Sequence, residues 1–253
     1  MLLRHLKNKA EATRSVEVGW LLNAEEGGFI WGEPTRLISD RPPPRHAKSA
    51  SLCPAVIDHE ARFFVVHCPI NVKLRVKIID TGEATLINTA GDKTEIRTKT
   101  LGKMVKIVAA KEWRYPDRPI IQIHTPYVFI ADEPAFMSLL PPFNYFRTPT
   151  LPGRLISGRL PIHIWPRPMM WAFEWIDTTR ELELERGEPW FYVHFETHHP
   201  ARQVRLVEAE LTPQLKEYMQ GARAVTNYVN RTYSLFKIAS ERRPRRLLSK
   251  KVR

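Results

Sequence analysis

Short runs in which apolar and polar residues alternate dominate the chain between residues 15 and 210. The clearest is NVKLRVKII (71–79), where apolar side chains alternate with Lys73, Arg75 and Lys77. A period of two is the pattern of a strand that buries one face and solvates the other. The turn residues DTGE and a second apolar run, ATLIN (84–88), follow it. This stretch predicts a β-hairpin with a basic outer face.

Similar runs recur along the chain and are separated by prolines, which number 21 of the 253 residues. Proline disrupts helices and marks turns, so its frequency favours many short strands. Residues 33–54, rich in proline, arginine and serine, are the longest predicted loop, while 92–96 and 103–108 are ambiguous. Further strands are predicted at 15–22, 28–32, 63–68, 120–124, 127–131, 153–165, 169–175, 182–185, 190–197 and 204–210. The expected fold class is mainly β, a sandwich or jelly roll, formed by one domain over residues 15–210.

The pattern changes at Thr212 and Pro213, which suit the N-cap and the first position of a helix. Gly221 is expected to interrupt this helix. Beyond it, apolar residues from Val225 to Ala239 recur at three- and four-residue steps. The spacing predicts a helical segment over 211–240 that packs its apolar stripe on the sheet. A basic tail over 241–253 is expected to follow, and residues 1–14 to form an N-terminal arm or a short helix.

The composition is that of an ordered globular protein, with 43% hydrophobic and 26% charged residues. There is no run of 18 apolar residues and no apolar core near the N-terminus, so neither a membrane span nor a secretory signal is predicted. Cys53 and Cys68 are the only cysteines, which gives no disulfide framework. We therefore expect a cytoplasmic protein without a membrane partner.

The formal net charge is +12, and half of the excess lies in the tail, which has seven basic residues and one acidic. A flexible arm of this kind neutralises phosphates and binds with a strong dependence on salt. The tail therefore predicts a nucleic acid or an acidic protein surface as the partner. The predicted binding residues are Arg242, Arg243, Arg245, Arg246, Lys250 and Lys251. The alternative interpretation is a solubilising chain end.

The run WFYVHFETHH (190–199) is the best candidate for a metal site. On a strand, His194, Glu196 and His198 point to the same face, about 7 Å apart at each step. One straight strand does not wrap its first and last ligands around one ion, so His163 or His124 is needed from another strand. The metal spacings of cupins and iron oxygenases are absent. The simpler interpretation is the solvated face of a half-buried strand.

Other clusters favour structural roles. Cys53, His59, His67 and Cys68 do not have the spacing of a zinc finger, and buried apolar cysteines explain them better. In IWPRPMMWAFEW (164–175), Trp171, Phe173 and Trp175 alternate as core residues do. Arg167 is the only basic residue near them, and none interleaves with them as base stacking would require. No phosphate-binding loop, dinucleotide fingerprint, serine-hydrolase elbow or zinc-protease motif occurs.

The segments LISGRLPIHIWPRPMMWAFEW, RGEPWFYVHFET and VTNYVNRTYSLFK resemble a family of uncharacterised proteins encoded by marine bacteriophages. The resemblance runs from about Cys53 to the tail. It implies a viral gene expressed in a bacterial host cell, with association with the virion as an alternative, and a fold in the style of a double-stranded β-helix. The family has no assigned activity, so the resemblance supplies no catalytic residues.

Three functions follow from these observations. The first is a non-enzymatic interaction protein whose tail and basic strand faces dock on nucleic acid or on an acidic protein. The second is a metal-dependent, cupin-like enzyme that holds a divalent metal through His194, Glu196 and His198. The third is a structural component of a virion or of its assembly. The sequence does not decide whether the protein is an enzyme, and it leaves the oligomeric state open.

Overall fold

The computed structural model describes residues 15–24, 28–38, 46–79, 83–91, 94–95, 97–199, 201–223 and 231–252. Over these residues the fold is mainly β, with fifteen strands in four sheets and two α-helices near the C-terminal end. The predicted fold class is therefore confirmed. The predicted arm at 1–14 lies outside the described residues. So do Val225, Tyr228 and Val229, the first residues of the apolar stripe predicted for the C-terminal helical segment.

The strands of the first half are β1 (Val16–Leu22), β2 (Thr35–Arg36), β3 (Phe63–His67), β4 (Val72–Ile78), β5 (Ala84–Asn88), β6 (Val105–Ile107) and β7 (Ile120–His124). Those of the second half are β8 (Tyr127–Ala131), β9 (Ala135–Leu140), β10 (Gly153–Leu155), β11 (Arg159–Pro161), β12 (Met170–Trp175), β13 (Leu182–Leu184), β14 (Pro189–Thr197) and β15 (Val204–Glu208). The α-helices are α2 (Pro54–Glu60), α3 (Thr98–Met104), α4 (Pro213–Arg223) and α5 (Thr232–Glu241).

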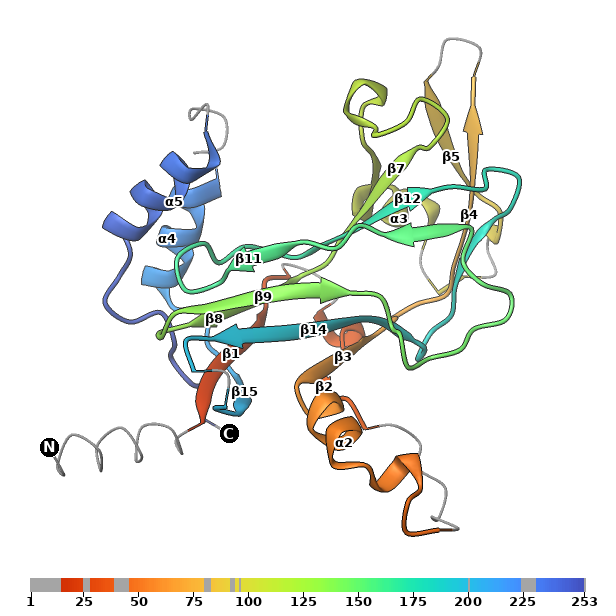
Figure 1. Ribbon diagram of the computed structural model, residues 1–253. Helices are drawn as coiled ribbons and strands as arrows, with labels where there is room; N and C mark the ends of the chain where they lie inside the picture. Colours follow the sequence, from red (N-terminus) through yellow and green to blue (C-terminus); the bar gives the residue numbers. More distant parts are fainter. Residues whose placement is uncertain are drawn as a thin grey trace, which may run out of the picture.

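The largest sheet has the order β11-β9-β14-β3-β2 and runs across the middle of the molecule (Figure 1). A four-stranded sheet, β10-β12-β7-β6, and the hairpin sheet β13-β4-β5 lie at one end of it. The fourth sheet, β15-β1-β8, lies toward helices α4 and α5 at the other end. In this sheet β1 pairs parallel with β15, from Val16 with Val204 to Trp20 with Glu208.

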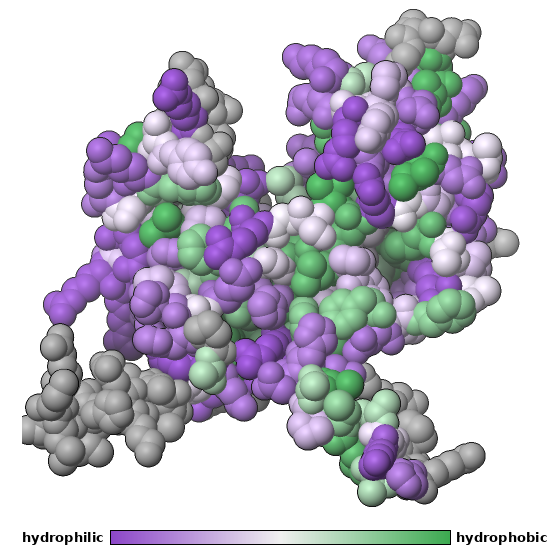
Figure 2. Space-filling model, viewed as in Figure 1, coloured by the Kyte–Doolittle hydropathy of each residue, from purple (hydrophilic) through white to green (hydrophobic). Residues whose placement is uncertain are grey.

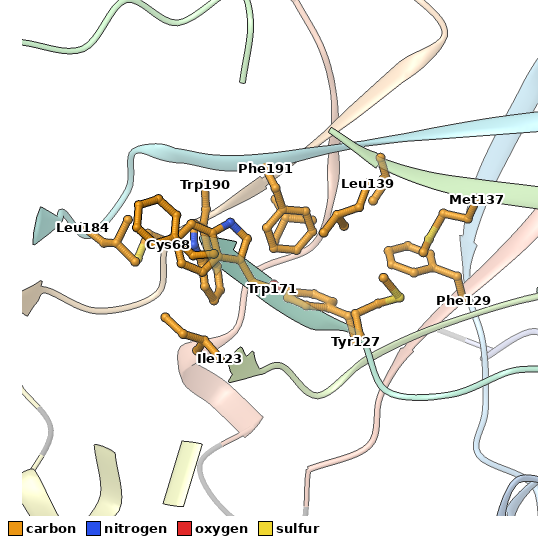
Figure 3. Packing of buried hydrophobic residues seen from close by; sticks show 14 of the residues in the cluster. Cys68, Ile123, Tyr127, Phe129, Met137, Leu139, Trp171, Leu184, Trp190 and Phe191 are labelled. Atoms are coloured by element: carbon orange, nitrogen blue, oxygen red, sulfur yellow. The ribbon is translucent and has the colours of Figure 1, made fainter. Parts of the chain in front are cut away.

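One large apolar cluster joins the sheets as in a sandwich, because each contributes its buried face to it. Trp171, Phe173 and Trp175 of β12 are at most 1% exposed, so the aromatic run is core, as its period of two predicts. Figure 3 shows Trp171 beside Trp190, with the ring centroids 5.6 Å apart. The aromatic residues of this strand are therefore closed to a ligand.

Several predicted elements are corrected. The run at 28–32 is not a strand but contains a 3₁₀ turn, Gly28–Ile30, from which Ile30 and Trp31 reach the core. The run at 153–165 is split at Gly158 into β10 and β11, which join different sheets. The sequence interpretation also missed β9, whose Ala135, Met137 and Leu139 are buried at period two.

Two short helices were also missed. The predicted loop at 33–54 ends where α2 begins, with Pro54 in the first turn of the helix. The ambiguous stretch at 103–108 is the end of α3 followed directly by β6. Both helices have only seven residues, too few for an apolar period of 3.6 to stand out.

The helix after residue 211 begins as predicted, because the hydroxyl of Thr212 accepts a hydrogen bond from the Leu215 N–H at 3.2 Å. Gly221 does not interrupt it, since α4 runs to Arg223 and its buried residues hold it in place. Helices α4 and α5 are in contact, and the Tyr218 hydroxyl lies 2.8 Å from the carbonyl oxygen of Ala239. No helix in the described part of the chain is long and apolar enough to cross a membrane.

Candidate nucleic-acid interface

The strand predicted to bind a metal, β14, places His194 and Glu196 on one face, opposite the buried Val193 and Phe195. Each side chain is already engaged there. The His194 ring lies 5.0 Å from the ring of Phe63, and burial lowers the pKa of its imidazole. Glu196 accepts hydrogen bonds from Arg159 at 2.7 and 2.9 Å, and these lower the pKa of its carboxyl.

His198 does not join them, because β14 ends at Thr197 and the His198 ring instead lies 5.0 Å from that of His199. His163, proposed as a partner ligand, shares its Nδ1 with the backbone of Ala135. Among the described residues no three histidine, cysteine or acidic side chains are grouped so that they would hold a metal ion. His194 and Glu196 do line a surface pocket of about 240 Å³, together with Asp58, Arg62 and Arg202.

The second soft-ligand cluster is also dispersed. The Cys68 thiol is buried and donates to the carbonyl oxygen of Ile70, and burial raises its pKa to about 12. Cys53 precedes α2, while the His59 ring packs on Phe63 at 4.9 Å. Cys68 therefore has the character of a buried apolar residue, as expected, and a thiolate there is disfavoured.

The basic tail is not a flexible arm over residues 242–252, which we call the C-terminal strap. Leu247 and Leu248 are 2% and 5% exposed and join an apolar cluster with Leu21, Ile130 and Leu215. Their N–H groups donate to Asp132 Oδ1 at 2.7 and 3.1 Å. Two main-chain hydrogen bonds fix the end of the strap beside β15. The Glu210 N–H donates to the carbonyl oxygen of Ser249, and the Lys251 N–H donates to that of Glu208.

Most of the charge on the strap is neutralised within the molecule. Lys250 pairs with Glu17 at 2.7 Å and Lys251 with Glu208 at 2.6 Å. Arg243 donates to the carbonyl oxygens of Ala131, Asp132 and His163, and it shares Asp132 with Arg246. Within the described chain, Arg242 and Arg245 alone of the six predicted binding residues form no ion pair.

The outer face of β4, predicted to be basic, is neutralised as well. Lys73 lies 2.7 Å from Glu183 and 3.3 Å from Glu181, and hydrogen bonds to these carboxylates raise the pKa of its ammonium group. Arg75 pairs with Glu181. Of the three basic residues that define this face, Lys77 is the one without an ion pair to another described residue.

A basic site that the sequence interpretation missed lies on the outer face of the β10-β12-β7-β6 sheet. Val105, Ile121 and Ile123 point into the core, so Lys106 and His124 point outward. They are near neighbours on that face, because Lys106 lies opposite Gln122 in the ladder, two residues before His124.

Two arginines from distant segments complete the site. The Arg167 guanidinium lies 4.9 Å from the ring of Trp165 and 3.7 Å from the sulfur of Met170, which is opposite His124 in the sheet. Arg223 ends α4, which the Tyr218 hydroxyl anchors to the carbonyl oxygen of Ile164 at 2.6 Å. Lys106, Arg167 and Arg223 all act electrostatically on His124.

We call Lys106, His124, Arg167 and Arg223 together the basic notch. Figure 2 shows that the surface is hollowed between the lobe of α4 and α5 and the lobe of β5 and β7. Burial lowers the pKa of His124, and the three cations lower it further. Among the described residues, no carboxylate is one of the groups that act on it. The His124 Nε2 atom is buried and has no hydrogen-bond partner in the described structure. The notch is therefore a concentration of uncompensated positive charge, which favours an anion.

Positive charge continues from the notch along the chain segment 97–118, which contains α3 and β6. This segment has two acidic residues, Glu112 and Asp117, and seven basic ones: Arg97, Lys99, Lys103, Lys106, Lys111, Arg114 and Arg118. None of the seven forms an ion pair with another described residue. The charge count of this segment was a signal in the sequence. No signal in the sequence indicated that Arg167 and Arg223 lie near His124, because their proximity depends on the tertiary fold.

No family model matches this chain, and no curated protein or solved structure is detectably similar to it.

Proposed function

We propose that the protein is a non-enzymatic binding protein that holds nucleic acid by its phosphates at the basic notch. The supporting observation is that Lys106, Arg167 and Arg223, from separate segments, all act on His124, and that no carboxylate of the described residues does so. Elsewhere, most of the basic side chains of the strap and of the β4 face are paired with carboxylates. The notch keeps its charge available for an external anion.

The setting of Arg167 supports this proposal in particular. Burial lowers the pKa of its guanidinium, but an arginine stays protonated at neutral pH. Its stacking on Trp165 holds the flat group in one orientation. A half-buried charge without a carboxylate partner is costly, and a phosphate accepting two parallel hydrogen bonds from it offsets that cost.

The length of the basic surface favours nucleic acid over an acidic protein. Charge extends from the notch over segment 97–118, which suits a partner with regularly repeated negative charge. The strap contributes less than the sequence predicts, through the exposed Arg242 and Arg245. The proposed binding residues therefore lie mainly at the notch rather than in the tail.

The test is the salt dependence of binding to a labelled duplex, measured by fluorescence anisotropy. With four phosphates neutralised, affinity should fall about 100-fold between 50 and 200 mM salt. Reversing two charges with Lys106→Glu and Arg223→Glu should weaken binding and make the salt slope shallower by about 2. Lys77→Glu is the matched control, because Lys77 is an exposed lysine on another sheet.

Two outcomes contradict the proposal. Binding that is indifferent to salt, or that Lys77→Glu weakens as much as Lys106→Glu does, removes the notch as the site. Displacement of the duplex by polyglutamate at equal charge concentration identifies an acidic protein as the partner instead. The metal-enzyme interpretation has no comparable support, because its three ligands do not gather. A role in virion assembly and a phage origin stay predictions.

A further inference from the structure

The connection between β6 and β7 joins the two strands that carry Lys106 and His124, at the end of their ladder where Ile107 lies opposite Ile121. Lys106 is one residue from that end, and His124 lies at the other end of the ladder. Trp113 anchors the connection: its side chain is buried and its indole N–H donates to the carbonyl oxygen of Val108 at 2.7 Å. A 3₁₀ turn at Ala110–Glu112 and a bond from the Arg118 N–H to the Tyr115 carbonyl oxygen shape the rest. The connection is a built loop with a defined surface.

An aromatic ring stands on this loop among unpaired cations. Tyr115 is 43% exposed, and the Arg118 guanidinium lies 4.3 Å from its ring centroid. Lys111 and Arg114 are exposed on the same loop and form no ion pair with another described residue. An exposed aromatic ring flanked by cations is the arrangement with which proteins stack a nucleobase while neutralising the neighbouring phosphates.

We infer that the protein takes single-stranded nucleic acid, with an unpaired base stacked on Tyr115 and phosphates farther along the same strand in the basic notch. This inference rests on the proposed function and adds the class of nucleic acid to it. In a duplex each base is already stacked on its neighbours and its flat face is closed to a side chain. Tyr115 therefore contributes to binding when the bases are free, and the notch contributes in both cases.

The experiment compares a labelled oligothymidine of about 20 nucleotides with a duplex of the same length, a span that exceeds the usual site size of a single-strand-binding domain. Tyr115→Ala should weaken binding of the single strand about tenfold and leave duplex binding within a factor of about two. Tyr115→Phe keeps the ring and should bind as the wild type does. Phe146→Ala is the control, because Phe146 is 88% exposed and lies on a different loop.

The outcomes separate this inference from the proposed function. If Lys106→Glu weakens both oligonucleotides but Tyr115→Ala weakens neither or weakens both equally, the notch stands and the stacking inference is wrong. An equal loss with Phe146→Ala also overturns it, because stacking then occurs elsewhere. If neither oligonucleotide binds with a dependence on salt, the proposed function fails and the inference with it.

Discussion

Gly19 of β1 occupies the point where the C-terminal strap meets the sheet, and replacing it tests whether the strap is packed there. A Cβ atom at residue 19 would lie 2.5 Å from Leu248 Cδ1, 2.8 Å from Ile130 Cγ1 and 3.0 Å from Ala209 Cβ. All three separations are shorter than van der Waals contact between carbon atoms. Gly19→Ala should therefore force the strap or β8 to move.

The expected loss is about 1–3 kcal/mol of the free energy of unfolding, the usual cost of one extra carbon in a filled core. Leu248→Ala should cost about 2–5 kcal/mol, because it removes a side chain that is 5% exposed. The double variant should be more stable than the sum of the two losses predicts. Its shortened residue 248 makes room for the new methyl group, and contacting residues couple by about 0.5–3 kcal/mol.

Urea unfolding followed by tryptophan fluorescence measures the stability of the three variants. Their midpoint urea concentrations are comparable where the slope of the unfolding free energy against urea is unchanged. Gly221→Ala is the matched control, since nothing lies within 4 Å of its added Cβ and it sits inside α4. That control should gain up to about 1 kcal/mol from helix propensity. If Gly19→Ala is as stable as the wild type, or if the two losses simply add, the strap is not packed against Gly19.

Three further predictions concern titration and charge. Burial lowers the pKa of His194 in the folded protein, so below about pH 6.5 the His194 imidazole binds a proton more readily in the unfolded chain than in the folded one. The free energy of unfolding should therefore fall as the pH drops from about 7 to 5. His194→Gln should reduce that fall in urea unfolding. Arg154→Ala should destabilise by about 3 kcal/mol, because it leaves the fully buried Glu174 carboxylate unpaired, and adding Glu174→Gln should recover part of the loss. Nucleic-acid affinity should rise as pH falls from about 7.5 to 5.5, since a bound phosphate favours protonated His124, and anisotropy with His124→Gln should lack this rise.

The sequence predicted the fold class because apolar and polar side chains alternate with a period of two along half-buried strands. It predicted the hairpin of β4 and β5 and the burial of Trp171, Phe173 and Trp175 for the same reason. It missed α2 and α3, since seven residues carry too little periodicity. It also joined β10 to β11, which belong to different sheets although three residues separate them.

The candidate site was harder to predict, because charge in a sequence does not reveal pairing. The seven basic residues of the tail form the densest basic cluster in the sequence, yet Lys250 and Lys251 pair with Glu17 and Glu208 across the fold. Conversely, Arg223 is an ordinary helix residue in sequence and acquires its role by lying near His124. Pairing is a tertiary property, so the sequence alone does not show that much of the tail's charge is paired while the notch residues form no ion pair with another described residue.

The parallel pairing of β1 with β15 has a consequence for synthesis on the ribosome. β1 can pair with β8 once residue 131 has emerged, but its other edge needs residues 204–208. At about 10 residues per second, roughly 8 seconds of translation separate the two events. During that interval one edge of an apolar strand has open main-chain donors and acceptors, the state from which chains aggregate. We therefore expect ribosome-associated chaperones to bind the nascent chain until β15 pairs with the open edge of β1.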